Sequence, residues 1–147
     1  MGTPHNTQEH RMLFESFKLL SNYAILPPNG RGRTTLGGEY FWNQPPEEIE
    51  KVGRDWLITE HRFTASWDYQ EIHPEADEFC YVVEGSVILH LESLDGSDRQ
   101  AITLATGSAF LIPRNMWHTA KVTEPMRMIL VTMGAGTLSR PCCSASP

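Results

Sequence analysis

The sequence predicts an all-β fold, a sandwich or barrel of short strands, with a short helix near the N-terminus. Three observations lead to this prediction. From Asp55 onward, apolar runs of four to eight residues recur, rich in valine, isoleucine and aromatic residues. Turn residues end each run, and Asp95-Gly96 is the sharpest hairpin signal. The 147 residues suit one hydrophobic core, and many short strands around one core protect their edges as a sandwich or barrel.

The N-terminal part is expected to contain a helix, a strand and a second short helix. Residues 11–24 carry apolar side chains at helical spacing, namely Leu13, Phe17, Leu20 and Ala24. After a proline and glycine cluster, the aromatic segment 34–42 is typical of a strand. Residues 45–48 place proline and acids where a helix begins, and Gly53 ends that unit.

The remaining chain is interpreted as eight strands without a fixed-period repeat. The tail after Gly134 lacks periodicity, and we expect it to be loosely held. The predicted strands cover residues 56–66, 67–73, 78–84, 86–92, 99–104, 108–112, 116–122 and 126–133.

Length and charge bound the domain organisation and the partners. We expect one domain over residues 1–147, with a barrel core at about 56–133 and flexible ends at 1–10 and 137–147. The 12 basic and 18 acidic residues give a net charge of -6 without a basic stripe, so no nucleic-acid partner is expected. Neither a signal peptide nor a long apolar run is present, which predicts a cytoplasmic protein without a membrane partner.

Four residues in two segments have the chemistry of metal ligands. Side chains two apart on a strand share a face, so Glu71 and His73 project the same way. The next strand begins with Glu78, and His118 lies midway along a later strand. Two imidazoles and two carboxylates suit iron, manganese, nickel or zinc. The sequence thus predicts a divalent metal ion, of open identity, bound by Glu71, His73, Glu78 and His118.

These residues also follow a family pattern. Residues 71–85 and 107–122 resemble the two motifs of the cupin superfamily, G-x5-H-x-H-x4-E-x6-G and G-x5-P-x-G-x2-H-x3-N. The residues that match the motifs in register are His73, Glu78, Gly85, Gly107, Pro113 and His118. The resemblance covers about residues 56–133. It implies a small jelly-roll barrel, also called a double-stranded β-helix, that holds one metal ion in its mouth.

The sequence departs from the family pattern at four positions. Ala65 stands for the first glycine, Asn115 for the turn glycine and Val122 for the final asparagine. Asn115 is a mild change, because asparagine tolerates the left-handed backbone conformation. Glu71 takes the place of the first ligand histidine, and it is either a fourth ligand or a carboxylate that orients a histidine. Two glutamates would neutralise a dication, which favours a higher oxidation state and raises the pKa of a bound water.

Three residues are candidates for a substrate pocket beside the metal. Trp67 shares the strand parity of Glu71, and Tyr40 lies in the aromatic N-terminal segment. Cys80 shares the parity of Glu78, so it faces either the pocket or the core, where a buried structural thiol is the more common role.

Fold alone does not determine function, because the cupin resemblance implies dioxygenases, isomerases, lyases, binding modules and storage proteins alike. The neutral ligand set and the aromatic residues favour a metal-dependent, oxygenase-like enzyme that acts on a small organic acid, phenol or enol. The alternatives are a cupin isomerase or lyase, a non-catalytic module that binds or senses a small ligand, and a metal-free barrel that serves assembly. We also expect a homodimer in which residues 13–42 cover a neighbour's sheet.

Overall fold

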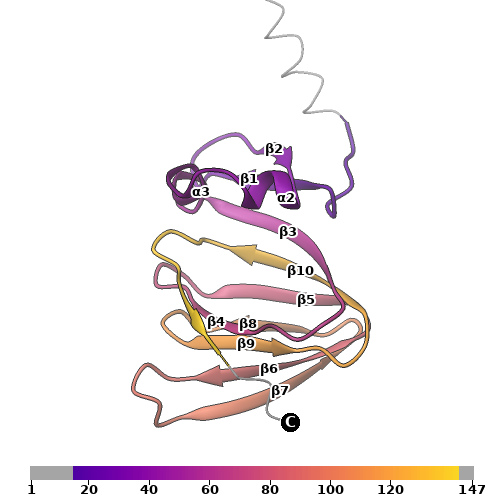
Figure 1. The fold of residues 1–147 in the computed structure, drawn as a ribbon. Helices are drawn as coiled ribbons and strands as arrows, with labels where there is room; N and C mark the ends of the chain where they lie inside the picture. Colours follow the sequence, from indigo (N-terminus) through magenta and orange to yellow (C-terminus); the bar gives the residue numbers. More distant parts are fainter. Residues whose placement is uncertain (1–14, 143–147) are drawn as a thin grey trace, which may run out of the picture.

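The computed structural model describes residues 15–142, which form two antiparallel sheets and two short helices (Figure 1). Sheet A has the strand order β2-β1-β3-β10-β5-β8, and sheet B has the order β11-β4-β9-β6-β7. In Figure 1, β1, β2 and both helices lie at one end beside β3, with β6 and β7 at the other end. The elements are β1 (Asn22–Leu26), β2 (Arg33–Leu36), α2 (Glu39–Trp42), α3 (Pro46–Val52), β3 (Trp56–Phe63), β4 (Tyr69–Ile72), β5 (Glu78–Glu84), β6 (Ser86–Glu92), β7 (Arg99–Ala105), β8 (Ala109–Ile112), β9 (Trp117–Lys121), β10 (Met126–Thr132) and β11 (Leu138–Pro141).

The eight strands predicted after residue 55 are confirmed. β5 and β6 have the predicted bounds, and the other six differ from the prediction at one or both ends. In β6, the buried side chains Val87, Leu89 and Leu91 alternate with more exposed ones. This period of two is that of a strand with one face on the core. The buried side chains of β5, β6 and β10 pack together into the main hydrophobic core.

The predicted helix over residues 11–24 is wrong for the part that the structure describes. Residues 15–21 form irregular structure and a turn, and β1 follows; residues 11–14 lie outside the described part. Tyr23 and Ile25 are buried two residues apart, in a second small core cluster. β1 forms because β2 and β3 pair with it on both sides, so its backbone groups are satisfied in the sheet.

The predicted strand over residues 34–42 is only partly correct, because β2 ends early and α2 follows. Two glycines make this break. Gly38 has a φ of 61°, and a Cβ on Gly37 would lie 2.6 Å from Cε1 of Tyr23, so the ring occupies that space. The second short helix is confirmed as α3, with proline and acids in its first turn. Within the described residues, neither helix is long and apolar enough to cross a membrane.

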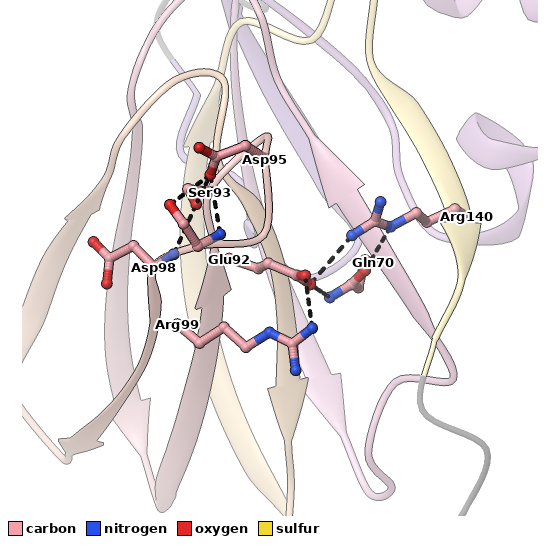
Figure 2. Close-up of polar contacts among 8 residues, drawn as sticks. Gln70, Glu92, Ser93, Asp95, Asp98, Arg99 and Arg140 are labelled. Atoms are coloured by element: carbon pink, nitrogen blue, oxygen red, sulfur yellow. Dashed lines mark hydrogen bonds and ion pairs between the residues drawn. The ribbon is translucent and has the colours of Figure 1, made fainter.

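A strand lies in the C-terminal tail, where the sequence indicates only a loosely held segment. β11 pairs with β4, and Arg140 ties it to the rest of sheet B (Figure 2). The Arg140 Nε donates to Gln70 Oε1 at 2.7 Å, and its Nη2 donates to Glu92 Oε2 at 3.2 Å. The guanidinium lies 4.0 Å from the ring centroid of Trp117. One arginine therefore connects β11 to β4, β6 and β9.

Candidate metal centre

Three potential metal ligands lie together on sheet B. Glu71 on β4 pairs directly with His118 on β9, so the two side chains share a face. His73 follows β4 by one residue and shares the parity of Glu71. One ligand atom from each residue lies within 4.8 Å of the others. Strand pairing thus brings together two segments that are distant in the sequence.

The fourth predicted residue, Glu78, reaches the same place from sheet A. It begins β5 and is buried. One carboxylate oxygen lies 3.4 Å from the Nε2 of His73, and the other lies 3.4 Å from the Nε2 of His118. Thr132 on β10 donates its hydroxyl to this carboxylate. The Glu78 carboxylate therefore lies between two imidazole rings. We refer to Glu71, His73, Glu78 and His118 as the acid–histidine cluster.

Hydrogen bonds determine which nitrogen of each histidine faces the cluster. The Thr137 hydroxyl donates to the Gly134 carbonyl at 2.6 Å, so it accepts from the Nδ1 of His73 at 2.7 Å. The Nδ1 of His118 lies 3.3 Å from the Met116 carbonyl, which can only accept. Both Nδ1 atoms therefore carry a proton. In the neutral tautomer, each ring presents the lone pair of Nε2 to the cluster.

This arrangement favours a cation between the side chains. Two Nε2 lone pairs repel a carboxylate at 3.4 Å unless a proton or a metal ion lies between them. The Nε2 of His118 is buried without a hydrogen-bond partner in the described part of the chain. Within residues 15–142, the Glu71 carboxylate also has no hydrogen-bond partner. Imidazole with carboxylate is a donor set for divalent transition metals, and polar contacts behind the rings are usual for metal-binding histidines. The residues present thus fit a divalent metal ion.

The cluster keeps negative charge in a buried position. Burial acts to raise the pKa of Glu78, but the imidazoles of His118 and His73, each 3.4 Å from the carboxylate, hold this pKa well below its usual range. Burial acts to lower the pKa of His73, yet its contact with Glu78 and the charge of Glu71 raise it. Burial raises the pKa of Glu71, and the Glu78 charge adds to this. An ionised Glu78 therefore attracts protons or a metal ion to the cluster.

Three residues of the cluster, Glu71, His73 and Glu78, line a cavity of about 460 Å³, a size typical of small-molecule sites. Trp67 and Tyr69 also line the cavity, with their rings stacked 5.1 Å apart. Every second residue of β3 contributes to the wall, namely Leu57, Thr59, His61 and Phe63. The cavity can therefore hold a small organic molecule next to the acid–histidine cluster.

The segment that contains the whole cluster matches a known family. Residues 64–132 match the family described as Cupin domain. This segment of the chain is a cupin domain. Its two antiparallel sheets are those of the jelly-roll barrel that the sequence resemblance implies, so the predicted fold class is confirmed.

Solved structures similar to this cupin differ in what their names describe. Hydroquinone 1,2-dioxygenase from Sphingomonas sp. TTNP3 with 4-hydroxybenzoate bound is 19% identical, with a TM-score of 0.46, over 54% of this chain and 61% of that one. A cupin-2 domain containing protein from Shewanella frigidimarina NCIMB 400 is 22% identical, with a TM-score of 0.41, over 59% of this chain and 71% of that one. Drosophila melanogaster CENP-C bound to CAL1 is 10% identical, with a TM-score of 0.45, over 52% and 68%.

These similarities concern the fold alone. The chain spans less than two thirds of the length of the dioxygenase. No curated protein shows significant sequence similarity to it.

Left-handed residues of the cupin motifs shape the turns near the site. Gly85, Gly107 and Asn115 have φ values of 86°, 84° and 60°. Asn115 thus adopts the conformation expected of a residue in the place of a glycine. Its backbone N–H donates to the His73 carbonyl at 2.9 Å. The turn of the second motif therefore also holds the segment that carries His73.

Of the three predicted pocket residues, Trp67 lines the cavity and Tyr40 does not. Tyr40 is 60% exposed on α2. Its neighbours Phe41 and Trp42 form that part of the wall instead. Tyr40 does not reach the cavity because the segment is helical there, and a helix turns consecutive side chains to different sides.

Cys80 also does not line the cavity. It is fully buried in the main core, and its thiol donates to the Phe110 carbonyl at 3.4 Å. Burial raises the pKa of the thiol to about 12. Of the two roles open from the sequence, Cys80 has that of a buried structural thiol.

His61 is a cavity residue to which the sequence analysis assigns no role. Its ring stacks on Phe63 at a centroid distance of 5.4 Å and lies 5.7 Å from the ring of Tyr23. Burial lowers its pKa, so the ring is neutral at pH 7. Strand parity with Thr59 and Phe63 was the available signal. It could not be used without knowing which face of β3 meets the cavity.

Proposed function

We propose that this cupin is a metal-dependent, oxygenase-like enzyme that acts on a small phenol, enol or organic acid. One observation carries the proposal. The Nε2 atoms of His73 and His118 converge with the carboxylate of Glu78, and His73 and Glu78 line a cavity that can hold a small molecule.

Glu71, His73, Glu78 and His118 would hold the metal ion. Bound iron, manganese, nickel or zinc would supply Lewis acidity, and iron or manganese would add redox chemistry with dioxygen. Two carboxylates and two neutral imidazoles balance the charge of a dication. This neutral set favours oxidation of a chelated substrate over hydrolysis, because it weakens the pull on a bound water.

Neighbouring groups keep the ligands in place before a substrate binds. Thr137 orients His73, and Thr132 holds the carboxylate of Glu78. Their hydrogen bonds reduce the reorganisation that substrate binding requires. Glu71 has no hydrogen-bond partner within residues 15–142, so its carboxylate is available to the ion.

The remaining wall suits a flat, mostly apolar ligand. Trp42, Phe63 and Trp67 present aromatic surface to the cavity. A ring placed among them would displace water, and the loss of water strengthens the electrostatic interactions of the cluster.

Metal content tests the ligand assignment. Elemental analysis of protein purified without added metal is expected to give about one divalent transition metal ion per chain. His73→Ala and His118→Ala are expected to lose it, whereas His90→Ala, which changes an exposed histidine on β6, should retain it. Equal metal content in all four proteins, or a wild type that binds none of the four metals, would contradict the proposal.

Oxygen uptake tests the reaction type. The iron-loaded or manganese-loaded protein is expected to consume dioxygen with a catechol, an enediol or a hydroxy acid, and His118→Ala should not. Conversion of a substrate without oxygen uptake would indicate an isomerase or lyase. Binding without any turnover would indicate a sensing module.

A further inference from the structure

Two neighbouring polar residues of the cavity are not used by the proposed metal site. Thr59 and His61 lie on the cavity face of β3. Neither side chain makes a hydrogen bond to another residue in the range 15–142. The threonines near the cluster differ, since Thr132 donates to Glu78 and Thr137 bonds both His73 and Gly134. Thr59 and His61 therefore keep their hydrogen-bonding capacity for a ligand.

His61 is displaced along β3 from the acid–histidine cluster. Thr132, which contacts Glu78, pairs with Leu57, whereas His61 pairs with Met128. Four residues along a strand correspond to a backbone displacement of roughly 13 Å. Thr59 lies midway. The polar pair thus lies toward the end of the cavity that is away from the cluster.

A row of aromatic rings joins the two ends. Ring centroids are 6.4 Å apart for His118 and Trp67, 5.5 Å for Trp67 and Phe63, and 5.4 Å for Phe63 and His61. Trp67, Phe63 and His61 line the cavity, so a planar ligand with one end at the cluster can contact the rings of Trp67 and Phe63 and reach His61 with its other end.

The ring of His61 is held in position before a ligand binds. It stacks on Phe63 with an interplanar angle of 19° and lies 6.2 Å from the ring of Trp42. Trp42 in turn donates its indole N–H to the hydroxyl of Tyr23 at 3.3 Å. Burial lowers the pKa of His61, so the neutral ring offers one donor and one acceptor nitrogen.

The charges of the cavity decide which ligand group can bind at this end. Among the described residues, no lysine or arginine lines the wall, and its carboxylates are Glu71 and Glu78. A ligand carboxylate beside His61 would lose water without gaining a cation, which is costly. A hydroxyl can donate to one partner and accept from another, so it matches Thr59 and His61.

We propose that His61, with Thr59 beside it, recognises a hydroxyl substituent on a planar ring whose other end lies at the acid–histidine cluster. This inference rests on the proposed function, because it takes the same cavity as the substrate site. It narrows the substrate class to hydroxylated rings that carry no charge at the far end. His61 is a positioning residue in this role.

Isothermal titration calorimetry of the metal-free and the Zn²⁺-loaded protein tests the inference. Zinc is used because it has no redox chemistry and therefore does not oxidise the catechol probes. The probes are catechol, 4-(hydroxymethyl)catechol, 4-(2-hydroxyethyl)catechol and 3,4-dihydroxybenzoate, which share the same head group. At least one of the two alcohols is expected to bind about fivefold to tenfold more tightly than catechol, the gain of one net hydrogen bond. The dihydroxybenzoate should bind more weakly than catechol.

Variants of the polar pair identify the source of this preference. His61→Phe keeps the ring stacking and removes both nitrogens, so it should bind catechol normally and lose the preference for the alcohols. Thr59→Val should reduce the preference in part. His90→Phe, the matched change at an exposed histidine, should keep it in full. If His61→Phe is poorly folded by circular dichroism, His61→Gln, which keeps polar atoms and loses the fixed ring, should show a reduced preference.

Three results would overturn the inference: an unchanged preference in His61→Phe, tighter binding of the dihydroxybenzoate than of catechol, or no binding of any probe to either form. The two proposals fail separately. A chain that binds no metal can still show the His61-dependent preference when metal-free. A chain without that preference can still have the expected metal content.

Discussion

Thr137 determines how His73 meets the cluster. Its hydroxyl gives its proton to Gly134, which leaves an acceptor for the Nδ1–H of His73. Without this acceptor, the imidazole can turn or change tautomer, and its Nε2 lone pair is no longer directed at the site.

We therefore expect Thr137→Val to weaken metal binding by about 10-fold to 100-fold, with a loss of folding stability of about 1 kcal/mol. Competition with a metal chelator measures the first effect, and urea unfolding measures the second. Thr103→Val, which changes an exposed threonine on β7, is the matched control and should leave metal affinity unchanged. Equal affinities in wild type and Thr137→Val would exclude this role for Thr137.

Asp95 stabilises the β6–β7 hairpin through hydrogen bonds to its carboxylate (Figure 2). Ser97 donates from its hydroxyl and its backbone N–H. Ser93 donates from its hydroxyl, as Figure 2 shows. These bonds, with those of Ser97 foremost, lower the pKa of Asp95 from 3.8 to about 2. Because the folded-state pKa is depressed, the stabilisation is present above the unfolded pKa and is lost as pH falls through the folded one.

Asp95→Asn should accordingly be less stable than wild type at pH 7, since the amide replaces a charged acceptor. The difference in free energy of unfolding should shrink as pH falls from about 4 toward 2. Urea unfolding followed across this range checks the prediction. A difference that stays constant over the range would show that ionisation of Asp95 contributes nothing.

The predictability of the site varies from residue to residue. Strand parity and the family pattern single out His73, Glu78 and His118, because both depend on residues that are near in sequence. The contacts of Thr137, just before β11, and of His61 on β3 depend instead on how these strands lie against others. Such long-range placement has no local signal, so these residues could be found only in the structure.

Two glycines of the cupin motifs have the same backbone conformation but differ in the space available for a Cβ atom. Gly85, between β5 and β6, and Gly107, before β8, have nearly the same φ, 86° and 84°. A Cβ on Gly85 would lie 2.8 Å from the Cβ of Met126 and 2.9 Å from the Pro125 carbonyl oxygen. A Cβ on Gly107 would meet nothing within 4 Å.

Gly107→Ala should therefore cost only the left-handed conformation, about 1–2 kcal/mol. Gly85→Ala should cost more, on the order of 3 kcal/mol, because β10 must also shift. Urea unfolding measures the loss in free energy of unfolding for each of the two variants. Equal losses would mean that the contact with Met126 and Pro125 relaxes without cost.

A strand was predictable where the hydrophobic pattern of its own residues agreed with its position in the sheet. β5 and β6 alternate and are bounded by turn residues, so even their limits were predicted. β1 was missed because a short apolar run fits both periods, and pairing with β2 and β3 decides between them. β11 has three exposed residues and no alternation, so its strand form follows from pairing with β4 and the contacts of Arg140.

The molecule as a whole presents an apolar surface on one side of sheet A. Leu26, Phe79 and Leu111 are exposed there, around a groove of about 470 Å³. Phe79 pairs with Leu111 across the strands, so their side chains share a face. We expect a second copy of the chain to cover this face.

The expected homodimer remains a prediction, and light scattering tests it. The mass should be about 33 kDa, twice the 16.6 kDa of one chain. Leu111→Lys should shift the mass toward that of one chain, whereas Leu94→Lys, an equally exposed change in the β6–β7 hairpin, should not. A wild-type mass near 17 kDa would overturn the prediction.

Glu78 comes from sheet A, Glu71 and His118 come from sheet B, and His73 directly follows β4 of sheet B. An ion held by all four would thus act as a non-covalent crosslink across the interior. Ion binding to the native state alone would stabilise it by about 4 kcal/mol at a thousandfold excess over Kd. A chelator should lower Tm, and hydrogen exchange should then accelerate first in β4, where the crosslink is anchored.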